Sequence, residues 1–300
     1  MYVVTGATGN TARVVAEQLL AKGHKVRVIG RSADRLQPLA GRGAEPFVAD
    51  LSDPAALTQA FTGAKAVYAM IPPNLKSDNP RAEQGRVADA LVGALQQAGV
   101  KHVVALSSIG ADKPAGTGPV AGLHDLEEKL KSIAGLNSLS LRAAYFMENT
   151  LAQAGIIKAI GKTAGPLRAD LKLPLIATHD IGVAAAEALL ALDFKVHETR
   201  ELLGQRDLDY KEIAEIIGNA IGKPDLEYIQ LPDEQLRPAL QQMGMSANVA
   251  GLLLEMSAAL NSGYMRALEP RTAGNTTPTT FETFVAKTFV PVYKGHTQAA

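Results

Sequence analysis

The chain has 300 residues, which is enough for one α/β domain of ordinary size and a smaller lobe. Hydrophobic residues make up 47% of it, and 30 Lys and Arg balance 30 Asp and Glu, so no net charge attracts nucleic acid or an acidic membrane. The absence of cysteine excludes disulfides, thiolate catalysis and Cys-ligated zinc.

The sequence carries no recognisable membrane or secretion signal. No run approaches the roughly 18 unbroken apolar residues of a membrane span. The start lacks the basic segment, apolar stretch and small-residue cleavage site of a signal peptide. We therefore expect a soluble, cytoplasmic protein.

The first half of the chain alternates short β-branched runs with longer runs of helical spacing, which is typical of βαβ units and a parallel sheet. The expected strands are 2–5, 25–29, 45–49, 66–71, 102–107 and 138–142. The expected helices are 11–22, 54–61, 80–98 and 123–134. This alternation predicts a doubly wound sheet.

The pattern becomes less regular after Arg142. Thr178-His179-Asp180 resembles a helix cap before an apolar helix over 181–192. The later expected elements are a helix over 209–222, a strand over 226–231, helices over 233–243 and 247–261, a polar loop over 276–280, a helix over 281–290 and a loosely held tail over 295–300.

These elements predict an α/β fold, namely a doubly wound parallel-sheet Rossmann domain with a smaller, mostly helical C-terminal lobe. We expect the Rossmann domain to comprise residues 1–150 plus about 178–204. The substrate-binding lobe would then comprise about 151–177 plus 205–300. The site should lie in the cleft at the carboxyl ends of the strands.

A glycine-rich turn follows the first strand and opens the first helix. Its spacing is G-x-x-G-x-x-A, formed by Gly6, Gly9 and Ala12. Gly6 permits a tight turn, Gly9 lets the backbone approach a pyrophosphate, and Ala12 allows close packing of helix on strand. Asn10 and Thr11 add donors at the helix N-terminus, which favours anions. The alternative is an ordinary turn without a ligand.

The end of the second strand discriminates between nicotinamide cofactors. NAD-selective sites carry an acidic residue there, whereas this strand ends in Gly30-Arg31-Ser32. The guanidinium of Arg31 suits a 2′-phosphate, and Ser32 can add a hydroxyl donor. This pattern predicts NADP(H) in preference to NAD(H), although Arg31 could also be a solvated arginine. Asp50 ends the third strand and either contacts adenine or stabilises a turn.

At this point the sequence resembles the NmrA-like family of atypical short-chain dehydrogenase/reductases. The residues that carry the resemblance run from the N-terminus to about residue 200, with a fainter match at 277–284. They are Thr5-Gly6-Ala7-Thr8-Gly9, Gly30-Arg31-Ser32, Ala49-Asp50-Leu51, 99–104, Ser107-Ser108, His124 with Glu128, Leu141-Arg142 and 145–149.

The resemblance implies a set of cofactor contacts at the strand ends. The loop from Gly6 through Thr8 to Thr11 would hold the pyrophosphate, and Arg31 and Ser32 the 2′-phosphate. Asp50 and Leu51 would flank the adenine. The remaining residues would line the ribose and nicotinamide; they are Met70, Ile71, Pro72, Tyr145 and Phe146.

The chain departs from ordinary short-chain dehydrogenases because it lacks their Tyr-x-x-x-Lys motif. His124 occupies a position where many relatives have lysine, and the quinone and triphenylmethane-dye reductases of the family resemble this chain in having histidine there. Histidine titrates near neutrality and can donate a proton. We take His124 and Tyr145 as candidate catalytic residues, with a polar helix residue as the alternative for His124. We expect Ser107 to bond backbone or cofactor.

The resulting hypothesis is an NADPH-dependent reductase of quinones or similar conjugated apolar acceptors. The alternative is a non-catalytic NADP(H)-sensing regulator that binds protein partners, and an isomerase or epimerase ranks third. The histidine spacing predicts no metal site. We expect a small apolar acceptor as partner, no nucleic acid and no membrane, and leave a homodimer open.

Overall fold

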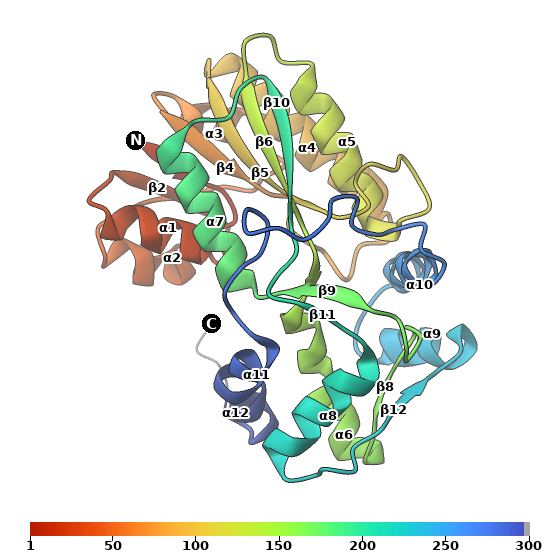
Figure 1. Cartoon of the computed structure of the whole chain (residues 1–300). Coiled ribbons are helices and arrows are strands. Elements are labelled where there is room, and N and C mark those ends of the chain that lie inside the picture. Colours follow the sequence, from red (N-terminus) through yellow and green to blue (C-terminus); the bar gives the residue numbers. More distant parts are fainter. Residues whose placement is uncertain (297–300) are drawn as a thin grey trace.

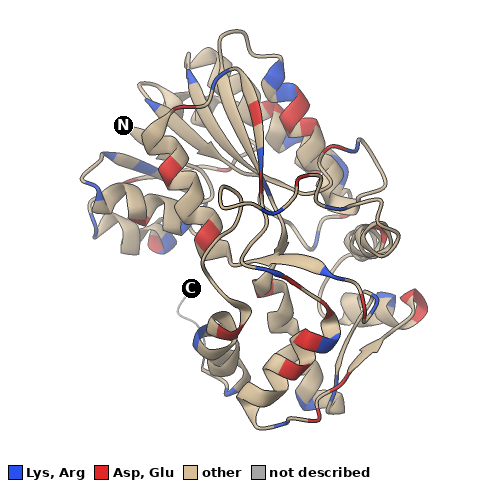
Figure 2. Cartoon of the chain, in the orientation of Figure 1, with Lys and Arg blue, Asp and Glu red and all other residues tan. Residues whose placement is uncertain are grey.

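The computed structural model describes residues 1–296, and the expected loose tail lies partly outside them, at 297–300. Figure 1 shows a larger unit built on a twisted sheet and a smaller unit below its carboxyl edge. Figure 2 shows that positively and negatively charged residues are interspersed along both units.

The larger unit contains a seven-stranded sheet whose pairs are all parallel. Its strand order is β10-β6-β5-β4-β1-β2-β3, so the order reverses between β1 and β4. The strands are β1 (Tyr2–Val4), β2 (Val26–Gly30), β3 (Glu45–Val48), β4 (Ala66–Ala69), β5 (His102–Ser108), β6 (Asn137–Ala143) and β10 (His197–Leu202). The predicted doubly wound Rossmann fold is therefore confirmed.

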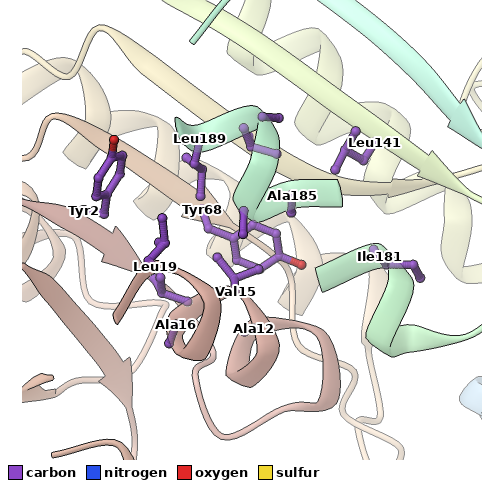
Figure 3. Close-up of a cluster of buried hydrophobic side chains, with 14 of the residues drawn as sticks. Tyr2, Ala12, Val15, Ala16, Leu19, Tyr68, Leu141, Ile181, Ala185 and Leu189 are labelled. Carbon is purple, nitrogen blue, oxygen red and sulfur yellow. The ribbon is translucent and has the colours of Figure 1, made fainter. Parts of the chain in front are cut away.

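Three helices cover one face of this sheet: α1 (Asn10–Ala21), α2 (Ala33–Ala40) and α7 (Thr178–Ala191). Figure 3 shows α1 and α7 meeting over the buried ring of Tyr68. A Cβ on Gly182 of α7 would lie 2.6 Å from Val14 Cβ, so only glycine permits this helix contact. The close fit fixes the N-terminus of α1 relative to the sheet.

The opposite face is covered by α3 (Pro54–Phe61), α4 (Pro80–Gln97) and α5 (Ala121–Lys131). Asp53 caps α3 by accepting from the N–H groups of Ala55 and Ala56 at 3.0 Å, and Pro54 follows at the first helical position. The expected boundaries of α3 are those observed.

The smaller unit has its own apolar core and two small sheets. The first sheet joins β7 (Tyr145–Phe146), β9 (Leu173–Ile176) and β11 (Asp207–Leu208), and the second joins β8 (Thr163–Gly165) and β12 (Tyr228–Gln230). Its principal helices are α6 (Gln153–Ile160), α8 (Tyr210–Ile221), α9 (Asp233–Gln242), α10 (Ala247–Asn261), α11 (Phe281–Phe284) and α12 (Val290–Tyr293). A capping box of Asp209 and Glu212 starts α8.

Residues 262–280, which we call the crossing segment, connect α10 to α11 along the larger unit (Figure 1). The buried carboxylate of Glu201 on β10 accepts from the N–H groups of Leu268 and Glu269 at 3.0 Å. At its far end, Asp180 accepts from the N–H and hydroxyl of Thr279 at 2.9 and 2.7 Å. Buried acids thus hold this loop by its backbone.

Two expectations about element ends are wrong. Helix α7 begins at Thr178 itself, and Ala177 provides no side-chain cap. The N–H and hydroxyl of Thr178 donate to the carboxylate of Glu148 instead. A residue distant in the sequence therefore caps this helix. The last helix extends beyond 290 as α12, after a π-helical turn over Val285–Phe289.

Candidate functional site

The glycine turn leaves the N-terminus of α1 open to an anion. Gly6 has a φ of +63°, which favours glycine, and its carbonyl accepts from the N–H of Gly9 at 2.9 Å. Gly9 is the N-cap in extended backbone, and among the described residues no side chain caps the helix. Because the first turn also lacks an acidic residue, its N–H groups and dipole suit a phosphate group.

The two glycines differ in what a side chain would meet. A Cβ on Gly6 would lie 2.6 Å from Met70 Sδ, whereas a Cβ on Gly9 would lie 3.3 Å from the Gly6 carbonyl oxygen. Gly6 is therefore needed by the fold, whereas Gly9 chiefly keeps the approach to the helix N-terminus clear. Thr8 is half-buried and Asn10 is exposed beside this approach.

Thr11 turns toward the interior. Its buried hydroxyl accepts a hydrogen bond from Tyr68 at 3.0 Å, and burial raises the pKa of Tyr68 so that this donor stays protonated. Because the Thr11 side chain is buried, its backbone N–H at the helix N-terminus is the group that it can offer to a ligand. Thr5 joins the same strand ends, since its hydroxyl donates to the Tyr68 carbonyl and accepts from the N–H of Met70.

The candidate adenine end lies beyond β2 and β3. Arg31 is exposed, and the Ser32 hydroxyl accepts from the N–H of Arg35 at 3.4 Å to cap α2. That hydroxyl keeps its own proton for donation. Asp50 accepts from the N–H and hydroxyl of Ser52 at 2.8 and 2.6 Å.

These contacts give Asp50 a structural role in the turn after β3. The bonds from Ser52 lower the pKa of Asp50, and the positive charge of Arg31 adds to the effect. Arg31 and Asp50 therefore lie at the same end of the candidate site, close enough for the charge of Arg31 to act on the Asp50 carboxylate. Leu51 is buried below the turn, where it forms part of the core rather than of an open surface.

At the opposite end, Ser107 belongs to a buried ionic network. Its hydroxyl donates to Glu127 Oε1 at 2.5 Å, and the Arg142 guanidinium donates to both carboxylate oxygens of Glu127 at 3.1 and 2.6 Å. The network connects the ends of β5 and β6 to α5. The sequence predicts that Ser107 bonds backbone or cofactor. In the structure its hydroxyl hydrogen is donated to a side chain, the carboxylate of Glu127.

Glu127 is a residue of this site that no sequence motif marks. A local signal existed in Arg142, an arginine within the otherwise apolar or small stretch Leu139-Ser140-Leu141-Arg142-Ala143. A charge on a buried strand requires a partner. The partner lies 15 residues away on α5, so only the folded chain identifies it.

His124 is held on α5 by one ring nitrogen. Its Nδ1 lies 2.8 Å from the carbonyl oxygen of Ala111 in the loop after β5. Because a carbonyl only accepts, Nδ1 carries the hydrogen and Nε2 is the nitrogen that can take up or release a proton. This arrangement provides a titratable position on a helix that Glu127 anchors to the sheet.

Tyr145 lies among tyrosines of the smaller unit. On β7 it pairs with Leu175 of β9, and its hydroxyl accepts from that of Tyr210 at 3.3 Å. The rings of Tyr210 and Tyr228 are 4.5 Å apart. Burial raises the pKa of Tyr145, so its hydroxyl stays protonated. This environment favours a role in positioning a bound molecule over a role as proton donor. Phe146 follows it and packs on the core below α7.

The remaining candidates end β4. Met70 and Pro72 are half-buried, and Ile71 is 9% exposed. In the part of the chain that the structure describes, no three His, Asp or Glu side chains gather to hold a metal ion. Within the same residues, no helix is both long and apolar enough to cross a bilayer.

An open helix N-terminus at the carboxyl edge of a parallel, doubly wound sheet defines a Rossmann-type protein with an anion-binding turn. The chain belongs to the NmrA-like family, whose sequence model matches residues 2–285. The resemblance drawn from the motifs is thereby confirmed.

Three known proteins are similar over nearly the whole chain. An NAD(P)H azoreductase of Xenophilus azovorans is 27% identical, covering 100% of this chain and 99% of its own. An NADPH-dependent quinone oxidoreductase from Escherichia coli, solved with NADPH, is 24% identical with a TM-score of 0.74, covering 99% and 95%. A Citrobacter triphenylmethane reductase, solved with NADP(H), is 20% identical with a TM-score of 0.77, covering 96% and 100%. The two structural likenesses establish the fold.

Proposed function

We propose that this protein is an NADPH-dependent reductase that transfers hydride to quinones or similar conjugated apolar acceptors. The observation that carries the proposal is the uncapped N-terminus of α1 behind Gly6 and Gly9, with Arg31 rather than an acid at the end of β2. The names of its relatives support the reaction class, since an azoreductase, a quinone oxidoreductase and a triphenylmethane reductase are all reductases.

The residues present fit a nicotinamide dinucleotide. The turn at Gly6–Gly9 would hold the pyrophosphate, Arg31 and Ser32 the 2′-phosphate, and Asp50 the edge of the adenine. Met70, Ile71 and Pro72 would border the nicotinamide. When bound, the cofactor supplies the hydride, and the protein provides binding and orientation.

The acceptor needs one proton in addition to the hydride to form a hydroquinone. His124 can supply it from Nε2 when the imidazole is doubly protonated, because Nδ1 remains bonded to Ala111. Tyr145 would shape the acceptor side without donating a proton. We also propose the division into a dinucleotide-binding unit (1–150 and about 178–204) and an acceptor-binding lobe, in which β7, near the end of the first stretch, pairs with β9 of the lobe.

The test is oxidation of NADPH and NADH by the purified protein with a panel of quinones, azo dyes and triphenylmethane dyes. We expect turnover with several acceptors and a lower KM for NADPH than for NADH. A protein that binds both redox forms of the cofactor but reduces no acceptor contradicts the proposal and favours an NADP(H)-sensing regulator.

A further inference from the structure

A cavity of about 220 Å³ lies between the two units, beneath the start of the crossing segment. One wall is Ile109, directly after β5, and another comes from β9 through Leu173. The end of α10 contributes Leu260, and the crossing segment contributes Met265 and Arg266. The cavity is thus built from both units and from the loop that joins them.

The interior of this cavity is apolar. Ile109, Leu173, Leu260 and Met265 are each no more than 5% exposed. A cavity of roughly 150 Å³ with comparable walls is enough to hold one benzene ring. The present one has room for a flat body of one or two rings.

Two of the three charged residues that line the cavity are in ion pairs, and the third is not. Lys172 pairs with Asp209 and Glu212 at 3.2 and 2.5 Å, and Asp207 pairs with Arg271. Arg266 is solvent-exposed and makes no ion pair with any described residue, and its one hydrogen bond there is from Nη1 to the Gly263 carbonyl at 3.3 Å. An unpaired guanidinium at the rim of an apolar cavity favours a ligand that is apolar and carries one acid group.

The cavity adjoins the candidate catalytic histidine through one short loop. Ile109 lines it, and a Cβ on Gly110 would lie 2.6 Å from Met265 Cγ, so Met265 packs directly on the turn. Two residues after Ile109, the carbonyl of Ala111 accepts from His124. A molecule in the cavity therefore lies against the same turn that orients His124.

We propose that this cavity is an acceptor subsite for flat aromatic anions, in which Arg266 binds the carboxylate or sulfonate. The assignment rests on the proposed reductase function for its role and on Arg266 and the apolar walls for its ligand. Acceptors with an acid group distant from the reducible ring are preferred over neutral acceptors of equal size.

Binding tests the cavity without any turnover. The probe is 2-naphthoate, titrated calorimetrically into the wild-type protein, with 2-naphthamide as its neutral match. We expect the naphthoate to bind more tightly than the amide, and Arg266→Gln to weaken naphthoate binding about three- to tenfold while leaving the amide unchanged. Arg168→Gln is the matched control, since Arg168 is an exposed arginine of the same unit that pairs with Asp170 outside the cavity.

A second variant tests the location. Ala267 lines the cavity, so Ala267→Phe should weaken naphthoate and amide alike. Equal binding of the two probes, or equal losses in Arg266→Gln and Arg168→Gln, would overturn the assignment of Arg266. Undiminished binding in Ala267→Phe would place the ligand elsewhere.

Kinetics test the role of the cavity. A naphthoquinone with a carboxylate on its second ring is compared with the corresponding carboxamide, using NADPH. We expect Arg266→Gln to raise KM for the carboxylate about three- to tenfold, with kcat and the carboxamide KM within twofold of wild type. Reduction of both quinones with no effect of Arg266 overturns the subsite and leaves the reductase standing. Reduction of neither, despite naphthoate binding at Arg266, contradicts the reductase proposal instead.

Discussion

At the scale of single residues, the proposed preference for NADPH depends on Arg31. We expect NADPH to bind more tightly than NADH, and Arg31→Ala to remove most of that difference. A charge-assisted bond contributes about 1.5–3 kcal/mol, and the lower end applies because Arg31 is exposed and solvent screens its charge. Titration of both cofactors against both proteins measures the change. Arg42→Ala, at an arginine paired with Glu17, is the control, and equal wild-type affinities would contradict the prediction.

In the proposed reaction, His124 supplies the proton. His124→Ala should lower kcat about 10- to 10³-fold if the ring both positions the acceptor and donates its proton. NADPH binding, measured by calorimetry, should change little because the phosphate contacts lie elsewhere. A variant as fast as wild type would remove His124 from the mechanism.

At the scale of elements, the two glycines of the turn into α1 have different roles. Gly6 is needed for folding, and Gly9 is proposed to keep the phosphate site open. Gly9 has a φ of −89°, which valine tolerates, and an added Cβ would lie 3.3 Å from the Gly6 carbonyl oxygen, a tight contact that a small shift of the turn relieves. Gly9→Val should lower Tm modestly and leave the circular dichroism spectrum that of a folded protein, but abolish cofactor binding because its side chain fills the approach to the helix N-terminus. Gly93→Val on α4, where a Cβ meets nothing within 4 Å, is the control. Undiminished binding would show that phosphate does not approach this turn.

The junction of α5 with the sheet depends on the ion pair between Glu127 and Arg142. Their side chains are 2% and 12% exposed, so Glu127→Ala leaves a buried guanidinium unpaired and should cost about 3–5 kcal/mol in the free energy of unfolding. Replacing both residues, as Glu127→Leu with Arg142→Met, should recover most of that loss. Urea denaturation gives both values. Glu128→Ala, at an exposed neighbour, should cost less than about 1 kcal/mol; an equal cost at both positions would contradict the argument.

Elements with a strong local pattern were predictable, and those fixed by distant partners were not. The six strands of the first half and the helix over Ala247–Asn261 were expected from periodicity alone. Helix α2 was not, because Pro38 lies inside it and only eight residues form it. Strand β10 reads His-Glu-Thr-Arg-Glu-Leu, and its charged residues suit the edge that it occupies but hide it from a search for apolar runs.

The candidate site shows the same limit. The glycines and Arg31 could be identified because backbone freedom and charge are local properties. The partners of Ser107 and Thr178 could not, since Glu127 and Glu148 lie 20 and 30 residues away in the chain. The cavity at Arg266 requires both units and the crossing segment, so no stretch of sequence contains it.

At the scale of the whole molecule, the two units meet where α7 begins. Glu148, which follows β7, accepts from Thr178, the first residue of α7, and Asp180 in the first turn of the same helix accepts from Thr279 of the crossing segment. Two carboxylates at one helix N-terminus thus connect the sheet unit, the smaller unit and the C-terminal loop. The helix dipole favours both charges, but their proximity and burial oppose ionisation of Glu148.

The last prediction concerns the pH dependence of this junction. Burial raises the pKa of Glu148, and the nearby charge of Asp180 raises it further against the bonds from Thr178. The folded protein therefore holds this proton at a pH where the unfolded chain has released it, so unfolding becomes easier as pH rises through the window between the ordinary glutamate pKa of about 4.3 and the raised value. Glu148→Gln keeps an acceptor for Thr178 and removes the titration.

Urea unfolding of wild type and Glu148→Gln at a series of pH values from acid to neutral measures the effect. The difference in unfolding free energy, wild type minus variant, should fall as pH rises through that window and then level off. Glu282→Gln, at a partly exposed acid whose pKa Arg206 lowers, should give the opposite slope, because its ionised form is the one stabilised by folding. A difference for Glu148→Gln that rises with pH, or does not change, would show that the junction holds Glu148 as a stabilised carboxylate and that its burial is not the dominant influence.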